Sequence, residues 1–241
     1  MWRRVCANYW GFDMETLLQH LDWQEWAALL FFIACWLSYA RYSDEEDRKK
    51  DSLLAVISRY RLEWMCEMLA RENRSIDAIM VGNLARSFTF FASTTMFILA
   101  ALVSALGYRD KVNSIIADIP FAKLSEGGYW QMKIFLLILI FVYAFFKFTW
   151  SMRQYNYVSI FIAAAPDYRK LPTNAEQIAA RGAFLTSNAA KHFNNGLRAY
   201  YFGLAALAWF VHPYAFMFAT AWIVWVTHRR EYRSATLKHL R

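Results

Sequence analysis

Lysine, arginine and amide side chains gather in three stretches of the sequence, each beside a long apolar run. Such groups carry positive charge or donate hydrogen bonds, so together they attract an anion or an anionic lipid headgroup. Taken singly, each charge is better explained as one that sets membrane orientation, with Asp77 paired to Arg74 or to another nearby base. If the three stretches converge, they form a basic vestibule. Its candidate residues are Arg74, Arg86, Lys147, Arg153, Lys191, His192 and Arg198.

Hydroxyl and phenylalanine side chains are interleaved at the start of Ser87–Leu106, which is twenty residues without a charge. As a helix rising about 1.5 Å per residue, this run spans a hydrocarbon core. Its residues Ser87, Phe90, Phe91 and Thr94 recur at three- and four-residue spacing, so they share one face of the helix. On such a face hydroxyls lower the desolvation cost of a passing ion, and phenylalanine rings form a constriction. Thr89 and Ser93 lie on a neighbouring face, and contacts between helices would have the same spacing. The predicted pore or cavity lining is Asn83, Ser87, Phe90, Phe91 and Thr94.

Sequence patterns typical of enzymes and metal sites are missing. There is no phosphate-binding loop, dinucleotide fingerprint, nucleophile elbow or zinc-protease motif. The cysteines Cys6, Cys35 and Cys66 are scattered, which supports neither a zinc site nor a disulfide framework. His192 beside Lys191 could titrate near neutral pH, although a hydrogen-bonded histidine at the interface is the commoner case. We therefore predict that the protein is not an enzyme and holds no metal or other cofactor.

Composition indicates a membrane protein. The chain has 241 residues, of which 58% are hydrophobic and 19% aromatic, more than is typical of a soluble domain. The net charge of +8 is better explained by orientation and contact with anionic headgroups than by nucleic-acid binding. We predict one all-α, polytopic membrane domain over residues 1–241. Its five predicted spans are about 23–40, 84–106, 130–146, 199–211 and 214–227.

Long helical extensions are predicted beyond the spans. One amphipathic helix is expected near 45–82, started by Ser43 and leading into the second span, and another near 130–165, stopped by Pro166. A further helix, capped by Thr173 or Asn174, should precede the fourth span. Because the last two spans are short, either they extend further or they form a hairpin, broken at His212-Pro213, that does not cross completely.

Two charged residues are predicted at the outer ends of spans. Glu25 should be reached by water, and Lys133 is close enough to the end of the third span to snorkel. Lysine and arginine are concentrated in 41–86, 147–198 and the tail, so the positive-inside rule places these regions in the cytoplasm. With five spans the N-terminus is then outside and the C-terminus inside, in a bacterial inner membrane.

The chain resembles a bacterial and plant membrane family catalogued as Domain of Unknown Function 599. The resemblance covers most of residues 50–235 and implies a membrane fold but no activity. It is carried by R-x-x-W-M at 61–65, R-x-x-D-A at 74–78, F-F-A-S-T-T at 90–95, F-F-K-F-T-W-S-x-R-Q-Y-N-Y at 145–157, G-L-R-A-Y-Y-F-x-L-A-A-L-A-W at 196–209 and R-R-E-Y-R-S at 229–234.

Two functions fit these features. The first is a homo-oligomeric channel or transporter for a small anionic solute, because small and hydroxylated residues in the second span suit helix association. The second is a structural or accessory subunit of a larger membrane complex, whose aromatic residues contact lipid and partner helices. The partners expected are membrane lipids, including anionic headgroups, further copies of the chain and other membrane subunits.

Overall fold

The structure is a computed structural model that describes residues 23–49, 52–108 and 127–240. Within these ranges the chain is helical and contains no strand, which confirms the predicted all-α class. The predicted outside position of the N-terminus concerns residues that lie outside the described ranges. The elements are α2 (Trp23–Lys49), α3 (Leu53–Ala70), α4 (Ser75–Ala105), α6 (Gly127–Ala163), η2 (Tyr168–Lys170), α7 (Ala175–Leu207), η3 (Ala208–Phe210), α8 (Pro213–Tyr232) and α9 (Ala235–Leu240).

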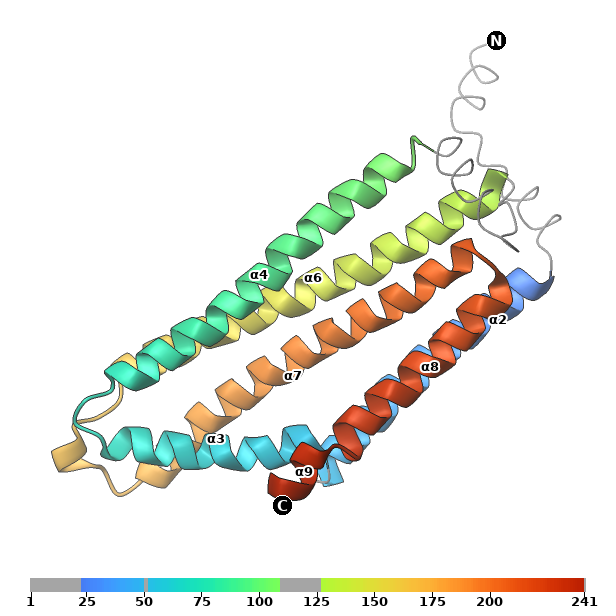
Figure 1. Cartoon of the computed structure of the whole chain (residues 1–241). Coiled ribbons are helices and arrows are strands. Elements are labelled where there is room, and N and C mark those ends of the chain that lie inside the picture. Colours follow the sequence, from blue (N-terminus) through green and yellow to red (C-terminus); the bar gives the residue numbers. More distant parts are fainter. Residues whose placement is uncertain (1–22, 50–51, 109–126, 241) are drawn as a thin grey trace, which may run out of the picture.

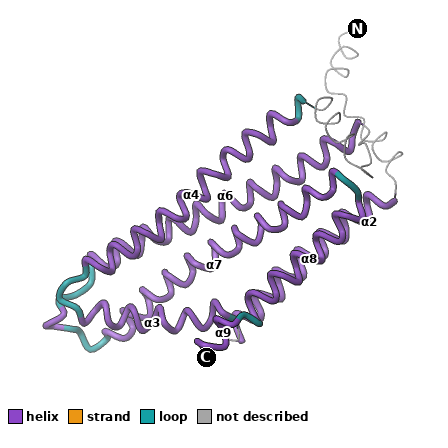
Figure 2. Tube along the Cα trace, in the orientation of Figure 1, coloured by secondary structure: helices purple, strands orange, loops and turns teal. Residues whose placement is uncertain are grey.

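Five long helices run side by side as an elongated bundle (Figure 1). α6 packs between α4 and α7, α7 also contacts α8, and α8 contacts α2. α3 lies across one end of the bundle, beside the C-terminal α9. We call this the α3 end, and the end at which η3 joins α7 to α8 the η3 end. Figure 2 shows that the turn after α3 and the connections flanking η2 lie at the α3 end.

Aromatic side chains form the main core between α2, α6, α7 and α8. Phe32, Phe148 and Phe202 are almost completely buried, and the Phe32 and Phe202 rings meet edge to face at 5.7 Å. Edge-to-face contacts between rings add to what burial alone contributes. A second cluster lies nearer the α3 end and includes Met65 and Phe88. Buried apolar side chains, mostly aromatic in the main core and mostly aliphatic or methionine in the second cluster, therefore hold the helices together.

Glycines allow α7 to approach α6 closely. A Cβ on Gly196 would lie 2.5 Å from Cε1 of Phe148, nearer than real Cβ contacts. At Gly182 a Cβ would lie 2.6 Å from Cε1 of Phe161. The absence of a side chain at these positions thus makes room for rings of α6.

Among the described residues, two helices, α4 and α6 over Tyr129–Ala163, are long and apolar enough to cross a membrane, so the five spans remain a prediction. These two helices point to membrane association. α6 also runs from Gly127 to Ala163 and stops before Pro166, as its sequence predicts. α7 starts well before the predicted fourth span and ends at Leu207, and α8 continues to Tyr232, past the end of the predicted fifth span. His212 caps α8 by accepting a hydrogen bond from the Tyr214 amide at 3.2 Å.

The prediction of one continuous helix near 45–82 is wrong. α2 continues to Lys49, and Ser43 is a buried interior residue of that helix rather than its start. The start of α3 is instead capped by Ser52, whose Oγ accepts from the Ala55 amide at 3.0 Å. A second break separates α3, which ends at Ala70, from α4, which begins at Ser75.

The helix predicted after residue 174 and the predicted fourth span are one helix, α7. Asn174 precedes its first residue, but its side chain makes no capping hydrogen bond. The polar residues between them, such as Lys191 and Asn195, do not interrupt the helix because both lie partly exposed on its surface. The apolar run of the fourth span therefore locates only part of α7, whose start follows residue 174 as predicted.

Glu25 and Lys133 are buried at the η3 end, so the predictions that water reaches Glu25 and that Lys133 snorkels are wrong. Glu25 and Lys133 are 6% and 3% exposed, and Lys133 Nζ lies 3.5 Å from Glu25 Oε1. Trp209 donates its indole N–H to the other oxygen of Glu25, and the Lys133 ammonium lies 5.5 Å from the Trp209 ring centroid. Pairing with opposite charge and an indole offsets the cost of removing both groups from water.

Candidate functional site

The predicted pore-lining residues of α4 do not all point the same way. Asn83, Ser87 and Phe90 are exposed on the outer face of the bundle, and Thr94 is partly exposed there. Phe91 turns inward, where its ring stacks on Phe148 at 5.3 Å and also meets Phe193 and Tyr200. Four of the five residues therefore lie where another helix, lipid or a pore would contact them, and the fifth belongs to the core.

The hydroxyls of this outer face bond to their own helix. Thr94 Oγ1 donates to the Phe90 carbonyl at 2.8 Å, Thr89 Oγ1 to the Ala85 carbonyl at 3.0 Å, and Ser87 Oγ to the Asn83 carbonyl at 3.4 Å. Such bonds make a hydroxyl tolerable in an apolar environment. Because the proton is used within the helix, each hydroxyl presents mainly lone pairs to a neighbour.

Arg74 holds the corner of the bundle at the α3 end. Its guanidinium donates to the carbonyls of Met68 and Leu69 at the end of α3, at 3.1 and 3.2 Å. It also donates to the carbonyls of Ala165 and Pro166 after α6, at 2.9 and 2.6 Å. These orphan helix-end acceptors satisfy the guanidinium, so Arg74 positions α3 and α6 instead of facing a solute.

Asp77 is paired with Arg71, which is the second alternative that the sequence leaves open. Its Oδ1 accepts from Arg71 Nη1 at 2.9 Å and from the Trp64 indole N–H at 2.7 Å. Asp77 is completely buried at the start of α4, where a carboxylate is also favoured by the helix dipole. The two contacts tie the start of α4 to α3.

Three of the predicted vestibule residues come together on the α6–α7 side of the bundle. Lys191 Nζ forms an ion pair with Asp44 of α2 at 2.7 Å, and Lys147 Nζ lies 5.2 Å from the Tyr143 ring centroid. Partial burial, and then the charges of Lys147 and Lys191, lower the pKa of His192. The two lysines therefore disfavour a proton on His192, while the Asp44 carboxylate pairs with one of them.

The other vestibule residues are more dispersed. Arg86 is exposed on α4, and Arg153 is exposed on α6, where its guanidinium stacks 5.9 Å from the Trp150 ring centroid. Arg198 pairs with Glu231 through two bonds, Nε to Oε1 at 2.8 Å and Nη2 to Oε2 at 2.9 Å. The Tyr39 hydroxyl donates to the same carboxylate at 2.6 Å. Arg198 is thus neutralised, and the structure does not gather all seven residues at one opening.

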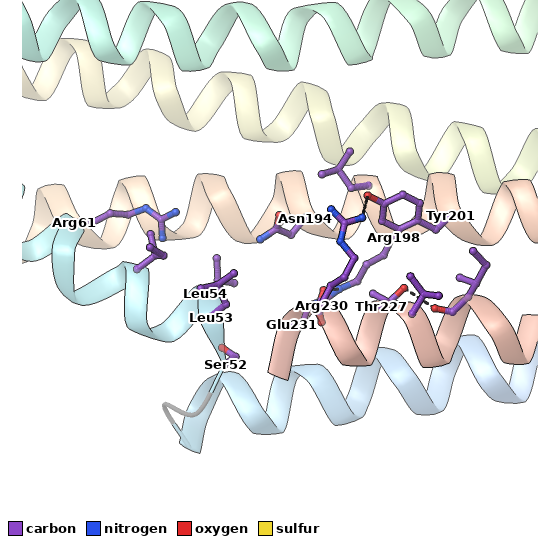
Figure 3. A pocket seen from close by; sticks show the side chains of 14 residues that line it. Ser52, Leu53, Leu54, Arg61, Asn194, Arg198, Tyr201, Thr227, Arg230 and Glu231 are labelled. Atoms are coloured by element: carbon purple, nitrogen blue, oxygen red, sulfur yellow. Dashed lines mark hydrogen bonds and ion pairs between the residues drawn. The ribbon is translucent and has the colours of Figure 1, made fainter. Parts of the chain in front are cut away.

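A cavity of about 310 Å³ lies between α3, α7 and α8 at the α3 end (Figure 3). It is lined by Arg198 and Glu231 and also by Arg61 and Arg230, which the sequence-based site predictions omit. Arg230 Nη1 donates to the Tyr201 hydroxyl at 3.3 Å. The sequence predicts an amphipathic helix in this region, but only the fold shows that Ile57 of α3 lines a cavity.

The family model for the protein family of unknown function DUF599 matches residues 27–236. The chain belongs to this family. The match confirms the resemblance carried by the motifs at 61–65, 145–157 and 196–209. Two residues that line the cavity lie in these motifs: Arg61 in the motif at 61–65 and Arg198 in the motif at 196–209. Comparisons with curated proteins and with solved structures found no match.

Proposed function

We propose that this DUF599 protein is a membrane-embedded subunit that assembles with copies of itself and conducts a small anionic solute. The observation that carries the proposal is the placement of α4. In the most apolar 18-residue stretch of α4, only 11% is buried inside the bundle, whereas 39% of the corresponding stretch of α6 is buried. A helix of this length and composition needs other helices or lipid around it.

The outer face of α4 supports a pathway between subunits. Asn83, Ser87, Phe90 and Thr94 recur along one side of the helix, so several copies around an axis would line a passage with amide, hydroxyl and ring groups. Because these hydroxyls offer mainly lone pairs, they can accept hydrogen bonds from water in the passage, but they do not favour an anion. Preference for an anion would instead come from positive charge at its mouth.

The basic residues at the α3 half of the bundle supply that charge. The charges of Lys147 and Lys191 both act on His192, and although Lys191 is paired with Asp44, Arg86 stands exposed on α4 itself, one turn after Asn83. A field of one sign concentrates small anions before they enter. We assign the solute class on this field, not on the α4 hydroxyls.

The topology proposed with this function has five crossings, by α2, α4, α6, α7 and α8, in a bacterial inner membrane. α2, α6 and α8 end at the α3 end, whereas α4 and α7 begin there (Figure 1). This alternation fits an outside N-terminus and a cytoplasmic α3 end, where lysine and arginine are concentrated.

A structural or accessory subunit is the second candidate, favoured by the internal bonds of the α4 hydroxyls. Because Ser87, Thr89 and Thr94 are satisfied within α4, the face needs neither water nor an ion. Phe90 and Phe97, 66% and 77% exposed, would then pack on a different membrane protein.

Solute flux distinguishes the two. Liposomes containing only this protein should pass chloride faster than protein-free liposomes, and Arg86→Ala should reduce the preference for chloride over potassium. Phe90→Ala should alter the rate, because it removes an exposed ring without opening the core. Tight, inert liposomes together with stable co-purification of other subunits would reject conduction and favour the accessory function.

A further inference from the structure

The seam between α7 and α8 changes from charged to apolar along its length. At the α3 end it forms the cavity that contains Arg198, Arg230 and Glu231 (Figure 3). Toward the η3 end it continues as a surface groove between the same helices, and Ile223 lines both the cavity and the groove. The groove is lined by Leu204, Ala205, Phe218, Ala219, Trp222 and Ile223.

The cavity holds more positive than negative charge. Arg198 and Glu231 neutralise one another, which leaves the guanidinium groups of Arg61 and Arg230. Nη1 of Arg61 is buried and, among the described residues, has no hydrogen-bond acceptor. Burial lowers the pKa of Arg61, as expected for a cation removed from water without a carboxylate beside it. An anion in the cavity would supply the missing acceptor.

The walls of the cavity and groove also require an apolar part in the ligand. Leu54 and Ile57 of α3 line the cavity together with Ile223 and Val226 of α8. Farther along, Phe218 is 70% exposed, so the groove is open to the surroundings of the bundle. A small hydrophilic anion would leave this apolar surface unused.

We propose that this seam binds an anionic phospholipid, with its phosphate at Arg61 and Arg230 and an acyl chain along the α7–α8 groove. Guanidinium groups match phosphate oxygens through paired hydrogen bonds, and Asn194 at the cavity wall can donate a further bond. The polar part lies at the α3 end and the apolar part toward the middle of the bundle, which is the order of headgroup and chain in one leaflet. The site does not depend on conduction.

Binding to the purified, full-length protein in mild detergent tests the proposal. Three probes are compared: dihexanoyl phosphatidic acid, dihexanoyl phosphatidylcholine and glycerol phosphate. The acidic lipid should bind and raise the melting temperature, whereas the other two should have little effect at the same concentration. Arg61→Gln and Arg230→Gln should each weaken binding about tenfold, the effect of losing a charge-assisted hydrogen bond. Ala219→Trp, which fills the groove from its surface, should also weaken binding.

Arg59→Gln is the matched control, because Arg59 is exposed on α3 and does not line the cavity. It should bind the acidic lipid like the wild type. Equal affinity for glycerol phosphate would overturn the lipid assignment in favour of a free anion, and equal affinity for phosphatidylcholine would remove the role of charge. Unchanged affinity in both Arg61→Gln and Arg230→Gln would place the lipid elsewhere. Because Arg230 is exposed, its variant remains informative if Arg61→Gln fails to fold.

Discussion

Arg198 on α7 and Glu231 on α8 are joined by two parallel hydrogen bonds, at 2.8 and 2.9 Å, and their side chains are only 12% and 23% exposed. Removing the carboxylate leaves a mostly buried guanidinium without its counter-ion. We predict that Glu231→Ala lowers the free energy of unfolding by about 3 kcal/mol, the low end for breaking a buried pair. Thermal unfolding in detergent measures this. In a double-mutant cycle with Arg198→Ala, strictly additive losses would contradict the pair.

Gly196 is predicted to tolerate no side chain. Gly196→Ala places a methyl group against the Phe148 ring, so we expect a loss of about 1–3 kcal/mol from overpacking. Gly82→Ala is the control, because a Cβ there meets nothing within 4 Å and alanine should stabilise α4 by about 0.5–1 kcal/mol. Unfolding measurements that find the two variants alike would contradict the close approach of α7 to α6.

The class of fold could be predicted from the sequence, because apolar run length and proline placement are local properties. The end of α6 before Pro166 and the break at His212-Pro213 are examples. The start of α7 was predicted from Thr173 and Asn174, but its continuity with the fourth span was missed, because an apolar run marks only the part of a helix that lies in an apolar environment. Helical hydrogen bonding continues through Lys191 and Asn195, whose polarity does not oppose it.

The site was harder to predict, because its partners are distant in sequence. Arg74 was assigned to the vestibule by its charge, yet it binds the carbonyls of Ala165 and Pro166, groups that every residue possesses. Phe90 and Phe91 are adjacent in the sequence, but only the Phe91 ring packs against the rings of Phe148 and Phe193 in the core. Helical spacing identified the outer face of α4 without showing where it ends.

His192 should make stability depend on pH. Burial and the charges of Lys147 and Lys191 hold its pKa below 6.5, so between that lowered pKa and 6.5 the unfolded state binds more protons than the folded state. Stability should therefore fall as the pH is lowered through this window and level off below it. The difference in melting temperature between wild type and His192→Asn, measured at successive pH values, should change only there. A pH-independent difference would mean that His192 titrates normally.

Assembly through α4 predicts a specific cross-link. With Cys6, Cys35 and Cys66 replaced by serine, Phe90→Cys should be joined between subunits by a short bifunctional thiol reagent. Phe218→Cys on α8 is the matched control, since Phe218 and Phe90 are 70% and 66% exposed. Gel electrophoresis after cross-linking in membranes reads the result. Dimers from Phe218→Cys but not from Phe90→Cys would assign the subunit interface to α8.

Chemical block of conduction at α4 is the most direct test of the proposed function. In liposomes containing only the cysteine-free protein with Phe90→Cys, chloride flux is measured before and after a negatively charged thiol reagent is added. Our account predicts flux above that of protein-free liposomes, a large reduction after modification of Phe90→Cys, and no reduction for Phe218→Cys. No flux before modification, or an equal reduction at both positions, would contradict conduction along the outer face of α4.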